Sequence, residues 1–197
     1  MTAMHNDITA ELYKTVALLE AVIADATLIE QTAQIATQCA AAFKAGHKIL
    51  LAGNGGSAAD SQHLAGEFAC RFAFDRPGLP ALALTTDGSV MTAICNDYEY
   101  DYVFARQLEG LGNAGDVFFA ISTSGKSPNI LRALEAARRK KLYCVGITGQ
   151  SGGAMLELCD ICLRIPSSET SKIQEAYKVL GHIICALVEK AMFGKAG

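Results

Sequence analysis

The chain has 197 residues, 51% of them hydrophobic, with 17 basic and 20 acidic side chains and a formal net charge of −3. This length and apolar content predict one domain with a sizeable core. The basic clusters that attract nucleic acid or anionic membranes are missing from the sequence, so neither is an expected partner. Residues 1–11 lack a cationic segment followed by an apolar run, and no apolar stretch could span a bilayer, which predicts a cytoplasmic protein.

The seven cysteines are an odd number and lie mostly in apolar periodic segments, which predicts reduced thiols in the core. Cys159 and Cys162 have the C-x-x-C spacing of metal and redox sites. A four-cysteine zinc site needs a second such pair, which the sequence lacks, and Cys162 lies in an apolar, strand-like stretch. A zinc or redox role for this pair is therefore not favoured.

Hydrophobic periodicity divides the chain into an N-terminal helical arm and an alternating region. Apolar residues recur every three or four positions from Ile8 to Phe43, which predicts two helices in an arm over residues 1–45. Over residues 46–197, short apolar runs alternate with helical patterns. The predicted strands are 48–53, 79–85, 116–122, 142–148 and 161–165, and the predicted helices are 57–72, 89–111 in two pieces, 127–140, 154–158 and 172–193. This alternation predicts a single α/β domain, 1–197, with a five-stranded parallel sheet covered by helices on both faces, whose strand order stays open.

In such a sheet, ligands lie beyond the carboxyl ends of the strands. The loop of residues 52–57, with sequence AGNGGS, follows the first predicted strand and leads into a helix. Its glycines let backbone amides approach an anion, and the helix start adds the favourable end of its dipole. A phosphate or sugar site is therefore predicted, with a plain tight turn as the alternative.

The same loop fits the dinucleotide pattern G-x-G-x-x-A through Gly53, Gly55 and Ala58. A nicotinamide-binding unit also needs an acidic residue at the end of the second strand. Thr85 and Thr86 occupy that end, so a nucleotide or redox cofactor is not expected.

A second loop, residues 122–127 with sequence STSGKS, follows the third predicted strand and opens a helix that Pro128 helps to start. It offers four hydroxyl groups, which is more than a helix cap needs, and so predicts phosphate binding. Its ending resembles a nucleotide triphosphate loop. That pattern requires glycine where this chain has Ala120, which disfavours a nucleotide triphosphatase.

Two helices carry further polar side chains. His63 and Glu67 are four residues apart, so they share a helix face beyond the first loop, although Glu67 could instead pair with Arg71. On the last helix, Gln174 and His182 are eight residues apart, roughly 12 Å along the axis. One metal ion bound by both would need side chains that lean together, or a second subunit.

These residues resemble the phosphoheptose isomerases of the sugar isomerase (SIS) domain superfamily over nearly the whole chain. The matching motifs are residues 51–60 (LAGNGGSAAD), Gln62, His63, Glu67, Arg76-Pro77, 84–87 (LTTD), 96–98 (NDY), 121–127 (ISTSGKS), 173–175 (IQE) and His182.

The resemblance implies an SIS-type, Rossmann-like three-layer sandwich and a cytoplasmic homotetramer. The implied reaction converts sedoheptulose 7-phosphate, a phosphorylated seven-carbon sugar, into D-glycero-D-manno-heptose 7-phosphate, an early step toward the heptose of lipopolysaccharide core or capsule. Glu67 corresponds to the base that moves a proton between C1 and C2, and His182 to the acid at the sugar oxygens. The implied zinc ligands are His63, Glu67, Gln174 and His182. The implied substrate-binding residues are Asn54, Gly55, Gly56, Ser57, Glu67, Asn96, Asp97, Ser122, Thr123, Ser124, Ser127 and Gln174.

The chemistry agrees in kind with these roles. An aldose–ketose shift passes through an enediolate, which requires a base and a positive group beside the developing oxyanion. A divalent ion can supply the positive group. Some relatives carry aspartate at the position of Ser171 and histidine at that of Tyr177, which affects finer sugar contacts only.

Similar domains also serve without chemistry, as sugar-phosphate sensors or as partners of the bacterial replication initiator. A sensor needs no base. The joint presence of His63, Glu67, Gln174 and His182 favours an enzyme.

Overall fold

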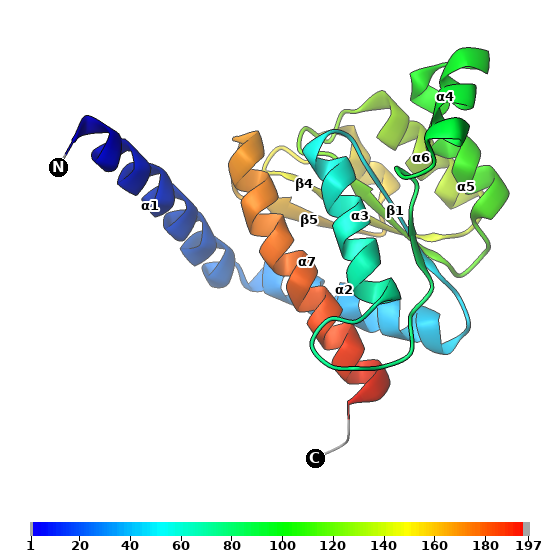
Figure 1. The fold of residues 1–197 in the computed structure, drawn as a ribbon, viewed down its shortest axis with the longest axis horizontal. Helices are drawn as coiled ribbons and strands as arrows, with labels where there is room; N and C mark the ends of the chain where they lie inside the picture. Colours follow the sequence, from blue (N-terminus) through cyan, green and yellow to red (C-terminus); the bar gives the residue numbers. More distant parts are fainter. Residues whose placement is uncertain (1, 195–197) are drawn as a thin grey trace.

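A parallel β-sheet forms the centre of the molecule (Figure 1). The computed structural model describes residues 2–194, and within them the sheet has five strands. The strands are β1 (Ile49–Gly53), β2 (Ala81–Ala83), β3 (Val117–Ile121), β4 (Tyr143–Gly149) and β5 (Ile161–Ile165). Their order is β2-β1-β3-β4-β5, and each neighbouring pair is parallel. The predicted fold class is confirmed, and the structure supplies the strand order that the sequence left open.

Helices cover both faces of the sheet. They are α1 (Ala3–Ala24), α2 (Ala26–Lys44), α3 (Gly56–Ala69), α4 (Gly88–Asp97), η1 (Tyr100–Tyr102), α5 (Ala105–Leu111), α6 (Pro128–Arg139), η2 (Gly153–Leu158) and α7 (Thr170–Phe193). Successive strand residues point to opposite faces. Leu51 and Phe119 therefore join the core beneath α2, α3 and α7, whereas Leu50 and Phe118 join the core beneath α5 and α6.

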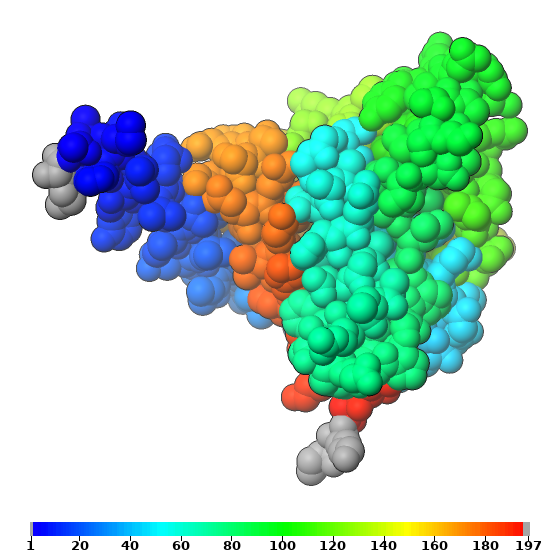
Figure 2. Space-filling view, in the orientation of Figure 1, coloured from blue at the N-terminus to red at the C-terminus, as the bar shows by residue number. Residues whose placement is uncertain are grey.

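The predicted N-terminal arm divides into two different helices. The apolar face of α2 is buried with the sheet, including Ile35 and Cys39, each fully buried. In contrast, α1 projects from the body, as Figures 1 and 2 show, and buries only Leu18 and Val22. The predicted boundary at residue 45 stays a prediction, and the ends of the predicted domain, residue 1 and residues 195–197, lie outside the described residues.

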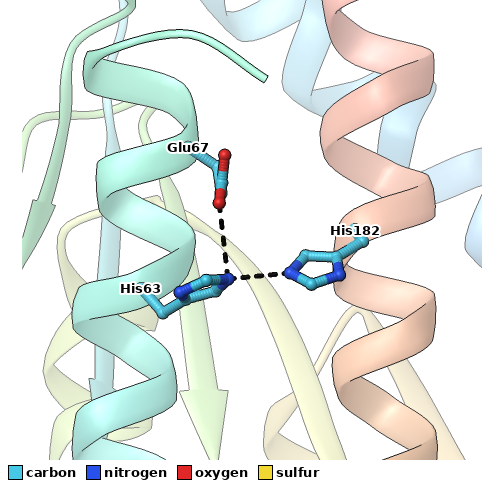
Figure 3. A group of neighbouring side chains, drawn as sticks. All are labelled: His63, Glu67 and His182. Carbon is cyan, nitrogen blue, oxygen red and sulfur yellow. Dashed lines mark hydrogen bonds and ion pairs between the residues drawn. The ribbon is translucent and has the colours of Figure 1, made fainter. Parts of the chain in front are cut away.

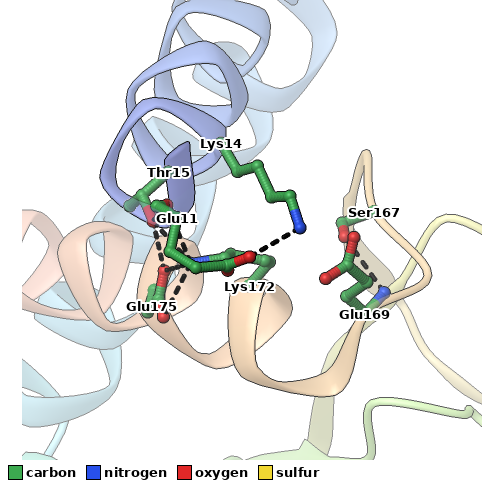
Figure 4. Close-up of polar contacts among 7 residues, drawn as sticks. All are labelled: Glu11, Lys14, Thr15, Ser167, Glu169, Lys172 and Glu175. Carbon is green, nitrogen blue, oxygen red and sulfur yellow. Dashed lines mark hydrogen bonds and ion pairs between the residues drawn. The ribbon is translucent and has the colours of Figure 1, made fainter. Parts of the chain in front are cut away.

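Polar contacts attach the middle of α1 to α7 (Figure 4). The Thr15 hydroxyl donates to Glu175 at 2.6 Å. The Lys172 ammonium lies 2.8 Å from the Thr15 hydroxyl, 3.0 Å from the Glu175 carboxylate and 3.7 Å from that of Glu11. Glu175, which the sequence places beside Gln174, therefore faces α1.

All seven cysteines are free thiols, of which Cys70 and Cys95 are exposed. Among the described helices, none combines the length and apolar content that a membrane crossing requires.

Among the elements that are shorter than predicted, β2 and α3 have a visible cause. The strand predicted over 79–85 pairs only over Ala81–Ala83, because β2 lies at the edge of the sheet and its ends bend away after single hydrogen bonds to β1. The helix predicted over 57–72 ends at Ala69, where the guanidinium of Arg76, in place of further helical N–H groups, donates hydrogen bonds to carbonyl groups of the last turn. Arg76 donates to the carbonyl oxygens of Glu67 at 2.8 Å and Phe68 at 2.6 Å.

A buried ion pair fixes this turn against α7. Arg76 Nε donates to Glu189 Oε1 at 3.0 Å, and both side chains are nearly inaccessible, with 2% and 1% exposed. The same carboxylate accepts the backbone N–H groups of Phe72 at 2.8 Å and Ala73 at 2.7 Å. Burial alone raises the pKa of Glu189, but these bonds outweigh burial and lower it. Glu189 therefore joins the end of α3 to the end of α7.

Replacing Glu189 with alanine should lower the free energy of unfolding by about 3–5 kcal/mol, because it leaves a buried guanidinium and two backbone donors without their acceptor. Urea unfolding measures this loss. Glu109→Ala is the matched control: its carboxylate is 42% exposed beside Arg106, so it should cost less than about 1 kcal/mol. Equal losses in the two variants would contradict this role of Glu189.

Candidate active site

The two glycine- and serine-rich loops lie side by side. β1 and β3 are direct neighbours, with Gly53 paired to Ile121, so the loops that follow them leave the sheet together. The order in which strands are added to the sheet changes side at β1, because β2 lies on one side of β1 and β3 on the other. Such a switch point opens a crevice at the carboxyl ends of parallel strands.

Three glycines of the first loop lie where the backbone conformation or a close neighbour favours glycine. Gly55 has φ of 56°, which favours glycine. A Cβ on Gly53 would lie 2.5 Å from the Ser57 carbonyl oxygen, and one on Gly56 would lie 2.6 Å from Gln174 Nε2. The loop therefore packs tightly on the first turn of α3 and against α7, and Gln174 lies directly beside it.

Hydroxyl groups gather in the second loop. Ser122 Oγ lies 2.9 Å from Ser127 Oγ and 3.4 Å from Ser124 Oγ, and the Ser124 hydroxyl accepts the N–H of Lys126 at 3.2 Å. A pocket of about 200 Å³ lies beside this loop; it is lined by Thr123, Ser124, Lys126, Gly149, Gln150, Ser151, Ser167 and Ser168. Hydroxyl and amide donors around a small hollow can bind a phosphate group.

A pair of asparagines joins the two loops. Asn54 Nδ2 donates to Asn129 Oδ1 at 2.9 Å, and Asn129 Nδ2 donates to Asn54 Oδ1 at 2.8 Å. The Tyr100 hydroxyl also donates to Asn54 Oδ1 at 2.8 Å. Asn54 was a predicted substrate ligand, whereas Asn129 and Tyr100 were missed. Only the position of Asn129, directly after Pro128 at the start of a helix, could have pointed to it.

Three further predicted residues meet between α3 and α7 (Figure 3). His63 Nε2 lies 2.7 Å from His182 Nε2 and 3.4 Å from Glu67 Oε1. One ligand atom from each residue lies within 4.8 Å of the other two. Glu67 thus faces His63, and the alternative pair with Arg71 is not among the ion pairs of the described residues.

The close approach of the two helices has a visible cause. A Cβ on Gly181 would lie 2.8 Å from Leu64 Cδ2, so a larger residue would push α7 away from α3. Gly181 precedes His182, and Leu64 follows His63. The His182 ring also packs on Phe72 with ring centroids 5.8 Å apart. These contacts position the imidazoles.

This donor set fits a divalent metal ion. Two imidazole nitrogens and one carboxylate oxygen form a ligand set that zinc accepts in enzymes. A neutral imidazole nitrogen carries either a proton or a lone pair, so two Nε2 atoms facing each other suit a shared proton or a shared cation. Cys185 is not part of this group of ligand atoms; burial first, and then the charge of Glu67, raises its pKa to about 12.

The remaining predicted residues make other contacts. Gln174 lies against the first loop, 3.5 Å from Ser57 Oγ. Asn96 and Asp97 end α4, where Asn96 donates to Asp97 at 2.8 Å. Ser57 is buried, and its hydroxyl contacts Tyr177 at 3.0 Å, a partner that the sequence did not reveal.

Known proteins share this arrangement of loops and helices. Residues 13–149 match the family described as the SIS domain. The phosphoheptose isomerase of Burkholderia pseudomallei (strain K96243) is 56% identical over 188 residues, which cover 95% of both chains. The structure of the phosphoheptose isomerase from Neisseria gonorrhoeae has 36% identity and a TM-score of 0.89, over 95% of this chain and all of that one. The phosphoheptose isomerase from Francisella tularensis has 35% identity and a TM-score of 0.91, over 96% of this chain and 100% of that one. The resemblance stated from the motifs is thereby confirmed: the chain belongs to the phosphoheptose isomerase family of SIS-domain proteins.

Proposed function

We propose that this chain interconverts sedoheptulose 7-phosphate and D-glycero-D-manno-heptose 7-phosphate. The observation that carries the proposal is the cluster of Glu67, His63 and His182 on helices α3 and α7, next to two loops suited to phosphate. The relatives reported above are named for this reaction. A base, an acid and a phosphate cradle are the parts that an aldose–ketose isomerisation requires.

Within this proposal, Glu67 transfers a proton between C1 and C2 of the sugar. Its carboxylate is 24% exposed, so it is accessible from the crevice while α3 limits its movement. His182 moves protons at the O1 and O2 oxygens, because its imidazole lies on the facing helix. The shift moves one proton from carbon to carbon and one from oxygen to oxygen, so no redox cofactor takes part.

The proposed contacts to substrate follow the loops. The phosphate binds the hydroxyl groups and amides of the second loop, and the sugar extends along the first loop toward Glu67. The proposed substrate ligands are Asn54, Gly55, Gly56, Ser57, Glu67, Asn96, Asp97, Ser122, Thr123, Ser124, Ser127 and Gln174. The product would supply heptose for lipopolysaccharide or capsule in the cytoplasm.

We further propose that His63, Glu67 and His182 hold a zinc ion, with Gln174 as the fourth ligand. The donor types of the three clustered residues support this assignment. When bound, the ion would polarise the sugar carbonyl.

We propose a homotetramer with active sites at subunit contacts. Ile8, Leu12 and Val16 form a stripe at four-residue spacing on α1 and are 53%, 64% and 48% exposed. An apolar stripe on a helix that projects from its own subunit is typical of an interface.

The Glu67→Gln variant should lose turnover of sedoheptulose 7-phosphate by about 10²–10⁴-fold, since the amide cannot accept the C–H proton. Binding of the sugar phosphate, measured by calorimetry, should survive because both loops are intact. Glu135→Gln, at an exposed position of α6, is the control and should behave like the parent. Turnover by Glu67→Gln at the parent rate would exclude the mechanism.

Zinc should co-purify with the parent at one ion per chain, and chelation should lower the rate. His63→Ala and His182→Ala should each lose the metal, as measured by elemental analysis, because each removes one of three clustered ligands. The control is His5→Ala, at an exposed position on α1. Full activity in a metal-free preparation would make zinc incidental.

Sedimentation velocity should show a tetramer for the parent and smaller species for Leu12→Glu, since a charge on the exposed stripe cannot be buried at an interface. Ala10→Glu places the same charge at an exposed position on the opposite face of α1 and should leave the tetramer intact. An active monomeric parent would refute the proposed assembly.

A further inference from the structure

Five side chains form a hydrogen-bonded chain behind the first loop, with its three central members, Ser57, Asp60 and Tyr177, buried. Tyr177 on α7 is completely buried, and its hydroxyl lies 2.7 Å from Asp60 Oδ2 and 3.0 Å from Ser57 Oγ, both on α3. The second oxygen of Asp60 lies 2.7 Å from the Lys178 ammonium. Ser57 Oγ in turn lies 3.5 Å from Gln174 Nε2, the longest contact of the series.

The protons in this chain have one consistent direction. A carboxylate paired with an ammonium accepts hydrogen bonds and donates none, so the Tyr177 O–H donates to Asp60. Burial, and then the bond to Asp60, raises the pKa of Tyr177, so the phenol keeps its single proton. The phenol oxygen can then only accept from Ser57. The Ser57 O–H is consequently committed to Tyr177, and Ser57 presents lone pairs on its other side.

This direction decides how the amide of Gln174 lies. A glutamine amide has a donor end and an acceptor end, and the partners decide which end faces which way. A Ser57 oxygen that can only accept on this side attracts Nε2, and this leaves Oε1 for another partner. The amide lies directly over Gly56, where an added Cβ would be 2.6 Å from Nε2 and 3.0 Å from Oε1.

We propose that Tyr177 is a positioning residue that, through Ser57, holds the Gln174 amide with its oxygen toward the substrate. This inference rests on the proposed function. With the amide in this orientation, Gln174 accepts a hydrogen bond from a sugar hydroxyl. If the Ser57 proton turned toward Gln174, the amide would present N–H groups there instead.

A double-mutant cycle tests the proposal. The two oxygens of a glutamate carboxylate are equivalent, so in Gln174→Glu the side chain has no preferred end that Tyr177 could direct toward the substrate. All proteins carry Glu67→Gln so that binding of sedoheptulose 7-phosphate is measured by calorimetry without turnover. Tyr177→Phe should weaken binding about tenfold when Gln174 is present, the value of one hydrogen bond. In the Gln174→Glu background the same change should cost less than about twofold if the coupling runs through the amide.

The outcomes separate this inference from the proposed function. Equal losses in both backgrounds would show that Tyr177 is merely structural and would overturn the inference. If the protein with Glu67→Gln alone binds no sedoheptulose 7-phosphate, the proposed function fails first. Tyr143→Phe, at a half-buried tyrosine at the start of β4, is the control and should leave binding unchanged.

A direct readout covers the case in which Gln174→Glu binds too weakly to measure. The side-chain amide protons of Gln174, identified by their loss in Gln174→Glu, should shift in the NMR spectrum of Tyr177→Phe and not in that of Tyr143→Phe. Unchanged Gln174 amide signals in Tyr177→Phe would overturn the inference.

Discussion

The candidate site depends on the close contact between α3 and α7. Leu64 packs on Gly181 so closely that a Cβ on Gly181 would lie 2.8 Å from it, and at the far end Arg76 and Glu189 lock the turn after α3 onto α7. Glu67 and the facing imidazoles of His63 and His182 lie beside the Leu64–Gly181 contact. An apolar contact limits the helix separation and an ion pair joins the helix ends, so two contacts outside the cluster hold the helices that carry it.

The sheet positions the other half of the site by topology. Because β1 lies between β2 and β3, the loops after β1 and β3 emerge next to each other at the one place where the chain changes direction. The reciprocal amide bonds of Asn54 and Asn129 then tie one loop to the other. The helix pair thus holds the groups that we propose to move protons, and the sheet holds the loops suited to phosphate, so two separate parts of the fold contribute to the candidate site.

The sequence predicted those parts of the molecule that depend on local pattern. The alternation of apolar runs and helical patterns predicted a parallel sheet, and the glycines and serines of the two loops predicted their positions after strands. Strand order depends on long-range pairing, which no local pattern encodes, so it stayed open. The early end of α3 was missed for the same reason: the guanidinium of Arg76 and the carboxylate of Glu189 are 113 residues apart along the chain.

Spacing along one helix was also a limited guide to the site. The eight residues between Gln174 and His182 raised the problem of how both could bind one ion, and the structure separates them: His182 faces α3 at His63, whereas Gln174 faces the first loop. Tyr177 lies between Gln174 and His182 along the chain, and the sequence marked it only as a position at which some relatives carry histidine. The buried Tyr177 hydroxyl links the two helices through Asp60 and Ser57. Because this hydroxyl has a single proton, it donates to one of these partners and accepts from the other, which gives the hydrogen-bonded chain a direction. For Gln174, whose two ends differ only in what they donate or accept, that direction decides which end can face a ligand.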